Sequence, residues 1–180
     1  MRWFWIDRFE EFVSGQRAVA VKNLSLAEET FHDYFPGYPI MPGSILLEGM
    51  AQTAGMLFGE VNDYYERLVL AKVSRVKYHV PSVPGDQLVY SVELKHVRNN
   101  GAMISGECYV GEALRAEAEF VLAVLPAGHE AERLFDPASF MLLLRLLRVY
   151  EVGVKPDGTP LQVPPYLLAA EAAELKRQIP

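Results

Sequence analysis

The sequence has a single cysteine, Cys108, and no excess of positive charge. One thiol allows neither an intramolecular disulfide nor a cysteine-based metal cluster, and it fits a reducing compartment without requiring one. The formal net charge is −6. That balance argues against nucleic acid and anionic membranes as main partners, since both select for a basic surface.

Long hydrophobic runs are also missing. The apolar run at the N-terminus is broken by Asp7 and Arg8, and no small-residue cleavage site follows it, so we expect no signal peptide. The apolar stretch FMLLLRLLRVY, residues 140–150, is too short to span a bilayer and contains Arg145 and Arg148. We therefore expect a soluble, cytoplasmic protein with no membrane partner.

The composition predicts one core with an appendage. Of the 180 residues, 51% are hydrophobic and 22% are charged, which is enough to fill one sizeable core. We expect one domain at residues 1–126 and a C-terminal helical extension at residues 127–180. Helices are predicted there at residues 137–150, with Asp136 as the cap, and at residues 167–178. The extension has no recognisable chemical motif, and we expect it to pack on the core or on a partner subunit.

Hydrophobic periodicity predicts one long helix among a series of strands. Residues 44–65 repeat apolar side chains at a 3.6-residue spacing. Alternating apolar side chains predict strands at residues 18–24, 69–76, 88–97, 102–110 and 114–125. The Asn-Asn-Gly run at residues 99–101 is typical of a hairpin turn, and two prolines make residues 80–86 a kinked connection. This order of elements indicates the α+β class, with a curled antiparallel sheet covering the helix.

The predicted helix has two faces of different character. One wide face is apolar and comprises Leu46, Leu47, Met50, Ala54, Leu57, Phe58 and Val61. The other comprises Ser44, Glu48, Gln52, Gly55 and Gly59. Such a polar stripe is ordinarily a solvent-facing surface, but an exposed helix face gains nothing from glycine. Close approach of another backbone or of an acyl chain to the two glycines is the alternative explanation.

A proline-rich segment before the helix carries the candidate chemistry. Residues 31–43, FHDYFPGYPIMPG, contain three prolines and two glycines, which predict a shaped loop without regular structure. The loop delivers Gly43 to the helix start, with Ser44 as N-cap, where unpaired N–H groups can polarise a carbonyl oxygen. Glu48 lies one turn further among apolar neighbours, which suits a carboxyl group to proton transfer. Gln52 lies a further turn along the same face and is expected to orient Glu48 or a ligand.

Three stretches resemble one enzyme family. Residues 33–52, DYFPGYPIMPGSILLEGMAQ, are similar to the signature of the FabZ-type 3-hydroxyacyl-acyl carrier protein dehydratases. Residues 7–25, DRFEEFVSGQRAVAVKNLS, and residues 78–88, YHVPSVPGDQL, resemble two further stretches of that family. The three occur in the family's order and approximate spacing, so the resemblance covers about residues 3–125.

The resemblance implies a fold and an activity. The fold is the hot-dog fold, in which a curved antiparallel sheet wraps around one long central helix, and two subunits join their sheets as a homodimer. A trimer of such dimers is left open. The implied reaction removes water from a 3-hydroxyacyl thioester, carried on acyl carrier protein or coenzyme A, without a metal or an organic cofactor. A histidine of one subunit and an acidic residue of the other transfer the protons, and the acyl chain enters a tunnel.

The family's residues map onto this sequence with one departure. The acidic residue maps to Glu48, and the glycine whose N–H polarises the thioester carbonyl maps to Gly43. The histidine position is Tyr34. Because a tyrosine ordinarily has a pKa near 10, against about 6.5 for histidine, Tyr34 is expected to donate a proton but to be a poor base.

Other residues of the motif complete the predicted site. Phe35, Pro36, Gly37, Pro42 and Gln52 are expected to contact the substrate. His32 is a further catalytic candidate: residues i and i+2 of an extended chain face the same way, so His32 would enter the site beside Tyr34 if the loop is rearranged. Alternatively, His32 is a surface residue. Two other functions stay open, a non-catalytic acyl-thioester-binding protein and an acyl-thioester hydrolase.

Overall fold

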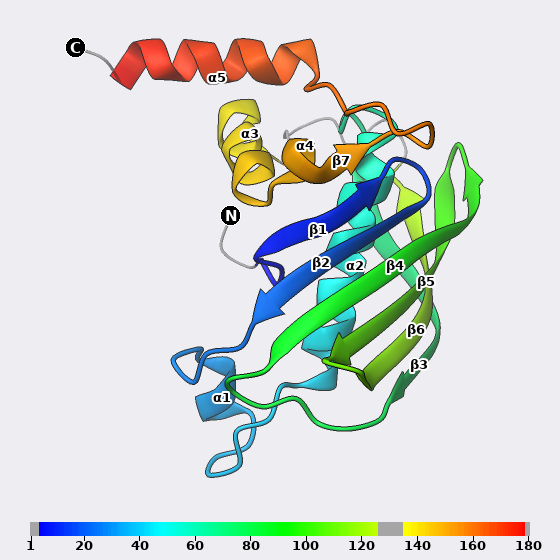
Figure 1. Cartoon of the computed structure of the whole chain (residues 1–180), viewed down its shortest axis with the longest axis vertical. Helices are drawn as coiled ribbons and strands as arrows, with labels where there is room; N and C mark the ends of the chain where they lie inside the picture. Colours follow the sequence, from blue (N-terminus) through cyan, green and yellow to red (C-terminus); the bar gives the residue numbers. More distant parts are fainter. Residues whose placement is uncertain (1–3, 126–134, 179–180) are drawn as a thin grey trace.

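A seven-stranded sheet forms the frame of the molecule (Figure 1). The computed structural model describes residues 4–125 and 135–178. The sheet order is β3-β6-β5-β4-β2-β1-β7, and every neighbouring pair is antiparallel except β1 with β7. The strands are β1 (Arg8–Val13), β2 (Arg17–Asn23), β3 (Leu68–Tyr78), β4 (Gln87–Arg98), β5 (Gly101–Val110), β6 (Ala113–Val124) and β7 (Gly153–Val154).

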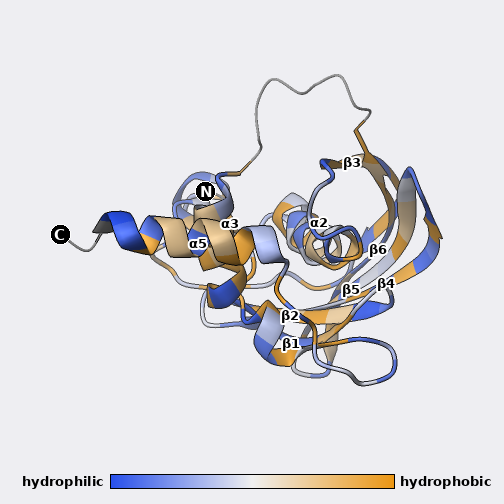
Figure 2. Cartoon of the chain, turned by 90° about the horizontal axis from the view of Figure 1, so that it is seen from above, coloured by the Kyte–Doolittle hydropathy of each residue, from blue (hydrophilic) through white to orange (hydrophobic). Residues whose placement is uncertain are grey.

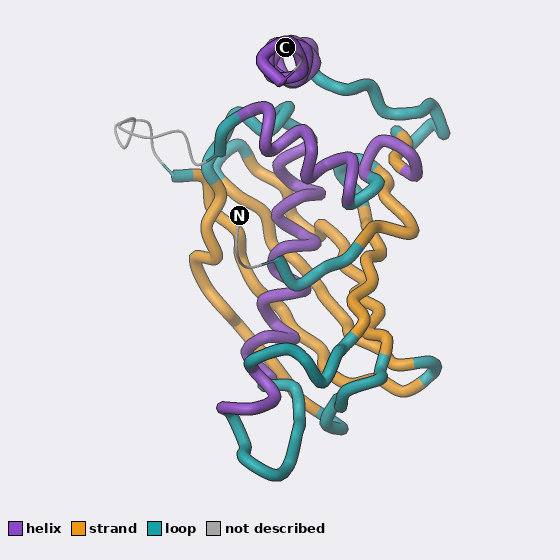
Figure 3. The backbone as a smooth tube through the Cα atoms, turned by 90° about the vertical axis from the view of Figure 1, so that its left-hand side faces the viewer, coloured by secondary structure: helices purple, strands orange, loops and turns teal. Residues whose placement is uncertain are grey.

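One long helix, α2 (Gly43–Glu60), lies inside the curve of this sheet. Seen from above, the strands bend around the helix axis (Figure 2), and the backbone trace shows the helix crossing the sheet along its length (Figure 3). Its apolar face is buried as predicted, including Leu46, Met50, Ala54 and Leu57, whereas Val61 lies beyond the helix end and is exposed. This is the hot-dog architecture implied by the sequence.

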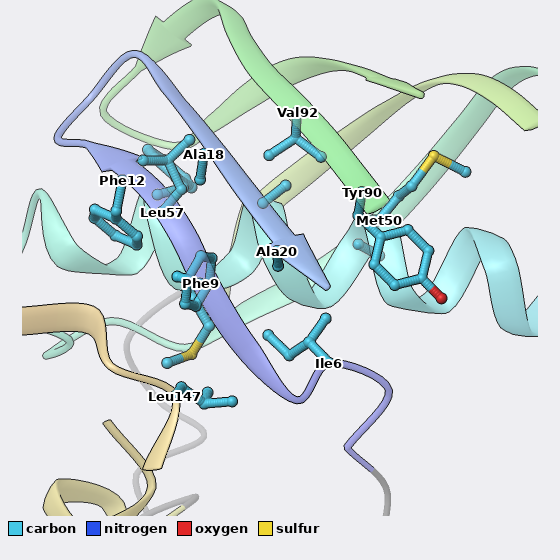
Figure 4. Close-up of a cluster of buried hydrophobic side chains, with 14 of the residues drawn as sticks. Ile6, Phe9, Phe12, Ala18, Ala20, Met50, Leu57, Tyr90, Val92 and Leu147 are labelled. Carbon is cyan, nitrogen blue, oxygen red and sulfur yellow. The ribbon is translucent and has the colours of Figure 1, made fainter. Parts of the chain in front are cut away.

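The core lies between α2 and the inward side chains of the sheet, with buried residues from β1, β2, β4, β5 and β6. Phe9 and Phe12 of β1 pack edge to face with ring centroids 5.1 Å apart, and both are fully buried. Figure 4 shows these two rings beside Leu57, with Met50 and Tyr90 further along the same layer. A continuous apolar layer therefore holds the helix against the sheet.

Strand β3 forms one edge of the sheet and is exposed along most of its length. It pairs with β6 only, and the register shifts twice, between Leu70 and Lys72 and between Val73 and Arg75. Such bulges bend a strand and increase its twist. Val69, Leu70 and Val73 on this edge are between 38% and 40% exposed, which is unusual for apolar residues in a sheet.

The C-terminal segment packs on the β1 end of the same fold. It contains α3 (Pro137–Leu146), α4 (Val149–Val152), β7 and α5 (Pro165–Gln178). Phe140, Met141, Leu144 and Leu167 join the common hydrophobic core. Asp136 caps α3 as predicted, because its carboxylate accepts a hydrogen bond of 2.8 Å from the Ser139 N–H. The boundary predicted after residue 126 lies outside the described residues.

Most of the predicted strands and helices are present in the structure, and several of their predicted ends and caps are wrong. The five predicted strands and the kinked connection at residues 80–86 are confirmed. The helix predicted to reach residue 65 ends at Glu60, and that predicted at residues 137–150 is divided by Arg148, which adopts a left-handed conformation with φ 62°. Ser44 is not the N-cap, since Pro42 holds that position. Strands β1 and β7 were not predicted.

Among the helices of residues 4–125 and 135–178, none combines the length and the hydrophobicity that a membrane-spanning segment needs. The same residues contain no group of three or more histidine, cysteine, aspartate or glutamate side chains arranged to hold a metal ion.

Candidate active site

The start of α2 presents free amide groups. Pro42, the N-cap, uses its carbonyl to accept the N–H groups of Ile45 at 3.0 Å and Leu46 at 3.4 Å. The N–H groups of Gly43 and Ser44 come before this first turn and have no acceptor within the helix. They therefore lie at the positive end of the helix dipole, where a carbonyl oxygen can be polarised.

An aromatic ring lies against the backbone of Gly43. A side chain at residue 43 would place its first carbon 2.7 Å from Cζ of Tyr78, far inside normal contact distance. Tyr78 ends strand β3, so the sheet edge and the helix start meet at this point. Burial, and then the neighbouring Tyr34 phenol, raise the pKa of Tyr78 above its ordinary value, so that its hydroxyl stays protonated at neutral pH.

Tyr34 and Gly43 line the same cavity at the helix start. The cavity has a volume of about 360 Å³, and Tyr78 and Met41 also line it. Tyr34 is 51% exposed, and its ring packs edge to face on Phe35 with centroids 4.7 Å apart. The tyrosine at the histidine position thus lies beside the amide end of α2.

Glu48 is held by a chain of two hydrogen bonds. The backbone N–H of Trp5 donates to Gln52 Oε1 over 2.8 Å, so the amide of Gln52 directs its Nε2 toward Glu48 Oε1, also at 2.8 Å. Gln52 therefore orients Glu48, one of the two roles expected for it. Glu48 is exposed in the single chain, so the apolar surroundings predicted from its sequence neighbours are not present there.

A second cavity, also of about 360 Å³, runs beside Glu48. Its walls are mostly apolar and include Ala51, Gly55 and Met56 of α2, with Leu68 and Val69 on the facing strand β3. Tyr34 and Gly43 do not line this cavity, and Glu48 does not line the first one. A single chain therefore separates the predicted carboxylate from the predicted hydroxyl and amide.

The structure contradicts the extended conformation that would place His32 beside Tyr34. The segment is not extended, because Thr30–Asp33 forms the short helix α1. Residues i and i+2 of a helix point in different directions, so His32 and Tyr34 do not share a face in the way an extended chain requires. His32 is exposed and does not line the cavity that contains Tyr34.

Of the other residues predicted to contact the substrate, some lie on the surface and one is buried. Phe35, Pro36 and Gly37 are exposed in the loop after α1, where Gly37 adopts φ 81° in a turn. Pro42 is buried at the helix start. In the single chain, none of the exposed three lines the cavity beside Gly43.

Comparison with known proteins identifies the family. Residues 3–119 match the FabA-like domain. The chain is 40% identical to the 3-hydroxyacyl-[acyl-carrier-protein] dehydratase FabZ of Koribacter versatilis, over 71% of this chain and 83% of that one. It is 38% identical to the FabZ of Pelotomaculum thermopropionicum, over 66% of this chain and 86% of the relative. The chain belongs to the FabA-like family.

Solved structures support the fold. A hypothetical thioesterase from Streptococcus pneumoniae, solved with coenzyme A, superposes with a TM-score of 0.54 at 15% identity, covering 66% of this chain and 84% of the other. At that identity the likeness concerns the hot-dog fold alone. The match to the FabA-like family ends at residue 119, so α3, α4 and α5 lie outside it.

Two contacts of this FabA-like chain were missed by sequence reasoning. Tyr78 was interpreted only as part of a family-like stretch, although its aromatic ring lies against the backbone of Gly43. The Trp5 N–H that fixes Gln52 gives no sequence signal, because it is a backbone group 47 residues away.

Proposed function

We propose that this chain dehydrates 3-hydroxyacyl thioesters, carried on acyl carrier protein or coenzyme A, to 2-enoyl thioesters in fatty acid or related lipid synthesis. The observation that carries the proposal is a pair of half-sites in each chain: Gln52 donates a hydrogen bond to Glu48 in one cavity, and Tyr34 lies beside the amide end of α2 at Gly43 in the other. The relatives named FabZ support the same reaction.

The proposed reaction needs one carboxylate for both proton transfers. Glu48 takes the proton from C2 of the substrate, and that electron pair forms the C2–C3 double bond. The C3–O bond breaks, and the departing hydroxyl receives the same proton from Glu48 and leaves as water. The Gly43 N–H stabilises the negative charge that develops on the thioester oxygen. The Tyr34 hydroxyl donates a hydrogen bond to the oxygen of the substrate.

The proposed active form is a homodimer. In one chain, Glu48 and the pair of Tyr34 and Gly43 line different cavities, so a shared site needs a second copy. The exposed apolar edge of β3 supports pairing there, because an unpaired strand edge presents free backbone groups. Pairing of the two β3 strands would bring Glu48 of one protomer toward Tyr34 of its partner. Sedimentation would distinguish the dimer from a trimer of dimers.

Substitution of Glu48 tests the proposal. Glu48→Gln keeps the shape of the side chain but cannot take up a proton, so we expect turnover of 3-hydroxyacyl thioesters to fall by roughly 10²–10⁴-fold. The matched control is Glu112→Gln, which makes the same change of charge at the exposed turn between β5 and β6. A Glu48→Gln variant with wild-type turnover contradicts the proposal.

Two further variants refine the roles of neighbouring residues. Tyr34→Phe removes only the hydroxyl and is expected to lower turnover several-fold, in proportion to one hydrogen bond of about 1 kcal/mol. Unchanged turnover in His32→Ala removes His32 from the mechanism. Product analysis separates the other functions: free thiol without enoyl product indicates a hydrolase, and binding without turnover indicates a non-catalytic protein.

A further inference from the structure

The cavity beside Glu48 continues along α2 as a groove. Glu48, Gln52, Gly55 and Gly59 line it at intervals of three or four residues, so they lie on one face of the helix. From Glu48 to Gly59 the helix rises by roughly 16 Å. The facing wall is apolar and comes from Leu68, Val69 and Leu70 of β3 together with Leu122 of β6. The groove therefore begins at the proposed catalytic carboxylate and runs along an apolar wall.

Three aromatic rings line the far end of this groove. Tyr64 lies against Gly59, where an added side-chain carbon would be 3.0 Å from its Cδ1 atom. The ring of Phe140 meets Tyr64 edge to face with centroids 5.1 Å apart, and Phe135 stacks on Phe140 at 4.9 Å. Phe140 is buried, whereas Phe135 is 42% exposed.

Two of the three rings come from the C-terminal segment. Phe135 precedes α3 and Phe140 lies within it, and both follow residue 119, where the match to the FabA-like domain ends. Two of the three end-wall rings thus come from outside the family's shared segment, and Tyr64 comes from within it.

We propose that the C-terminal segment closes the acyl groove and sets an upper limit on the length of the acyl chain that the protein accepts. This inference rests on the proposed function, since it takes the groove occupant to be the acyl chain of a thioester held at Glu48. An extended chain of 1.5 Å bonds advances about 1.3 Å per carbon. A groove of roughly 16 Å therefore accommodates about a dozen carbons before the chain meets the Phe140 ring.

The physical reason for a sharp limit is the change of surroundings at the end wall. Each methylene buried along the apolar groove strengthens binding roughly fourfold. The next carbon beyond the wall must displace a packed aromatic ring, which reverses this gain. Affinity and kcat/KM should rise steadily with acyl chain length and then fall within one or two carbons beyond the length that reaches the end wall.

Substitutions at the end wall and in the middle of the groove should shift the upper limit on acyl chain length in opposite directions. Phe135→Ala and Phe140→Ala remove end-wall rings and should move the limit to longer chains. Phe135→Ala is the safer of the two for folding, because this ring is half-exposed. Gly55→Leu fills the groove midway, where nothing lies within 4 Å of an added side-chain carbon, and should move the limit to shorter chains. Leu142→Ala, on the exposed side of α3, is the matched control.

The test compares two readouts across chain lengths. One is kcat/KM for dehydration of 3-hydroxyacyl-coenzyme A substrates, in even-numbered steps from butyryl to palmitoyl length. The other is the affinity of S-alkyl coenzyme A thioethers of the same lengths, measured by calorimetry, which needs no turnover. We expect the alanine variants at the wall to gain roughly fourfold per newly buried methylene for chains beyond the wild-type limit. Leu142→Ala should keep the wild-type profile.

The outcomes separate this inference from the proposed function. If dehydration proceeds but the limit is the same in wild type, Phe135→Ala and Gly55→Leu, the inference is overturned and the dehydratase proposal stands. If no chain length is dehydrated but the thioether limit moves with these variants, the end wall stands and the proposed reaction is wrong. If the upper chain length is the same in wild type and in the variants by both kcat/KM and thioether affinity, the inference is overturned whether or not the protein turns over substrate.

Discussion

The separation between α2 and the sheet depends on the absence of a side chain at Gly49. A first side-chain carbon at this residue would lie 2.3 Å from Cζ, 2.5 Å from Oη and 2.7 Å from Cε2 of Tyr90. Carbon atoms in normal contact are about 3.5–4.0 Å apart. Both residues are buried, so neither side can move into solvent. Gly49→Ala must therefore displace the helix or the Tyr90 ring by more than about 1 Å.

The expected cost follows from two opposing effects. Overpacking a filled core costs about 1–3 kcal/mol, and the ring contact here places Gly49→Ala at the upper end. Replacing glycine by alanine inside a helix returns about 1 kcal/mol. The net expectation is a destabilisation of about 2 kcal/mol. Gly55→Ala makes the same change in the same helix with nothing within 4 Å, and it should stabilise the fold by about 1 kcal/mol.

The assay is urea denaturation of the two variants and the wild type at one protein concentration, since association would shift apparent stability. The midpoints should differ while the slopes stay equal, and the gap of about 3 kcal/mol between the variants corresponds to roughly 6–12 °C in Tm for a chain of this size. A Gly49→Ala protein as stable as Gly55→Ala would refute the contact with Tyr90.

Three other predictions concern separate residues. Gln52→Leu removes the hydrogen bond to Glu48, so kcat for dehydration should fall about tenfold or more with little change in KM, and an unaltered kcat would show that Gln52 does not orient the carboxylate. The Ser139 N–H lowers the pKa of Asp136 below its ordinary value, so its stabilising effect is present above the unfolded-state pKa and lost as the pH falls. The Tm of wild type should therefore exceed that of Asp136→Ala at neutral pH, with the gap closing below about pH 4, and a gap independent of pH argues against the cap. Burial raises the pKa of the Cys108 thiol to about 12, so a thiol reagent at neutral pH should label the native protein far more slowly than the urea-unfolded one. Equal labelling rates would mean that the thiol is accessible.

Local pattern was sufficient for most of the sheet and for the helix. In β4, Leu88, Tyr90 and Val92 are buried as their alternation predicts, because a strand with one face on the core must place every second side chain inward. The same reasoning failed for β1, where a register shift between Phe9 and Glu11 sets the buried phenylalanines three residues apart. That spacing conceals the period of two that identifies a strand.

The motif determined the candidate site residues, but not their surroundings. Gly43, Glu48 and Gln52 lie on one helix, so their relative placement follows from helix geometry and was available from sequence. The location of Tyr34 in the cavity beside Gly43, and not in the one beside Glu48, depends on how the loop folds back.

The amino-acid sequence by itself determined β2 to β6, the long helix α2 and its buried face, because these depend on neighbours a few positions apart. Only the tertiary structure decided that Tyr78 covers Gly43, that the Trp5 backbone holds Gln52, and that Phe140 ends the groove. Each of these contacts joins residues far apart in the chain, and their meeting depends on the packing of the whole core, which no local period encodes.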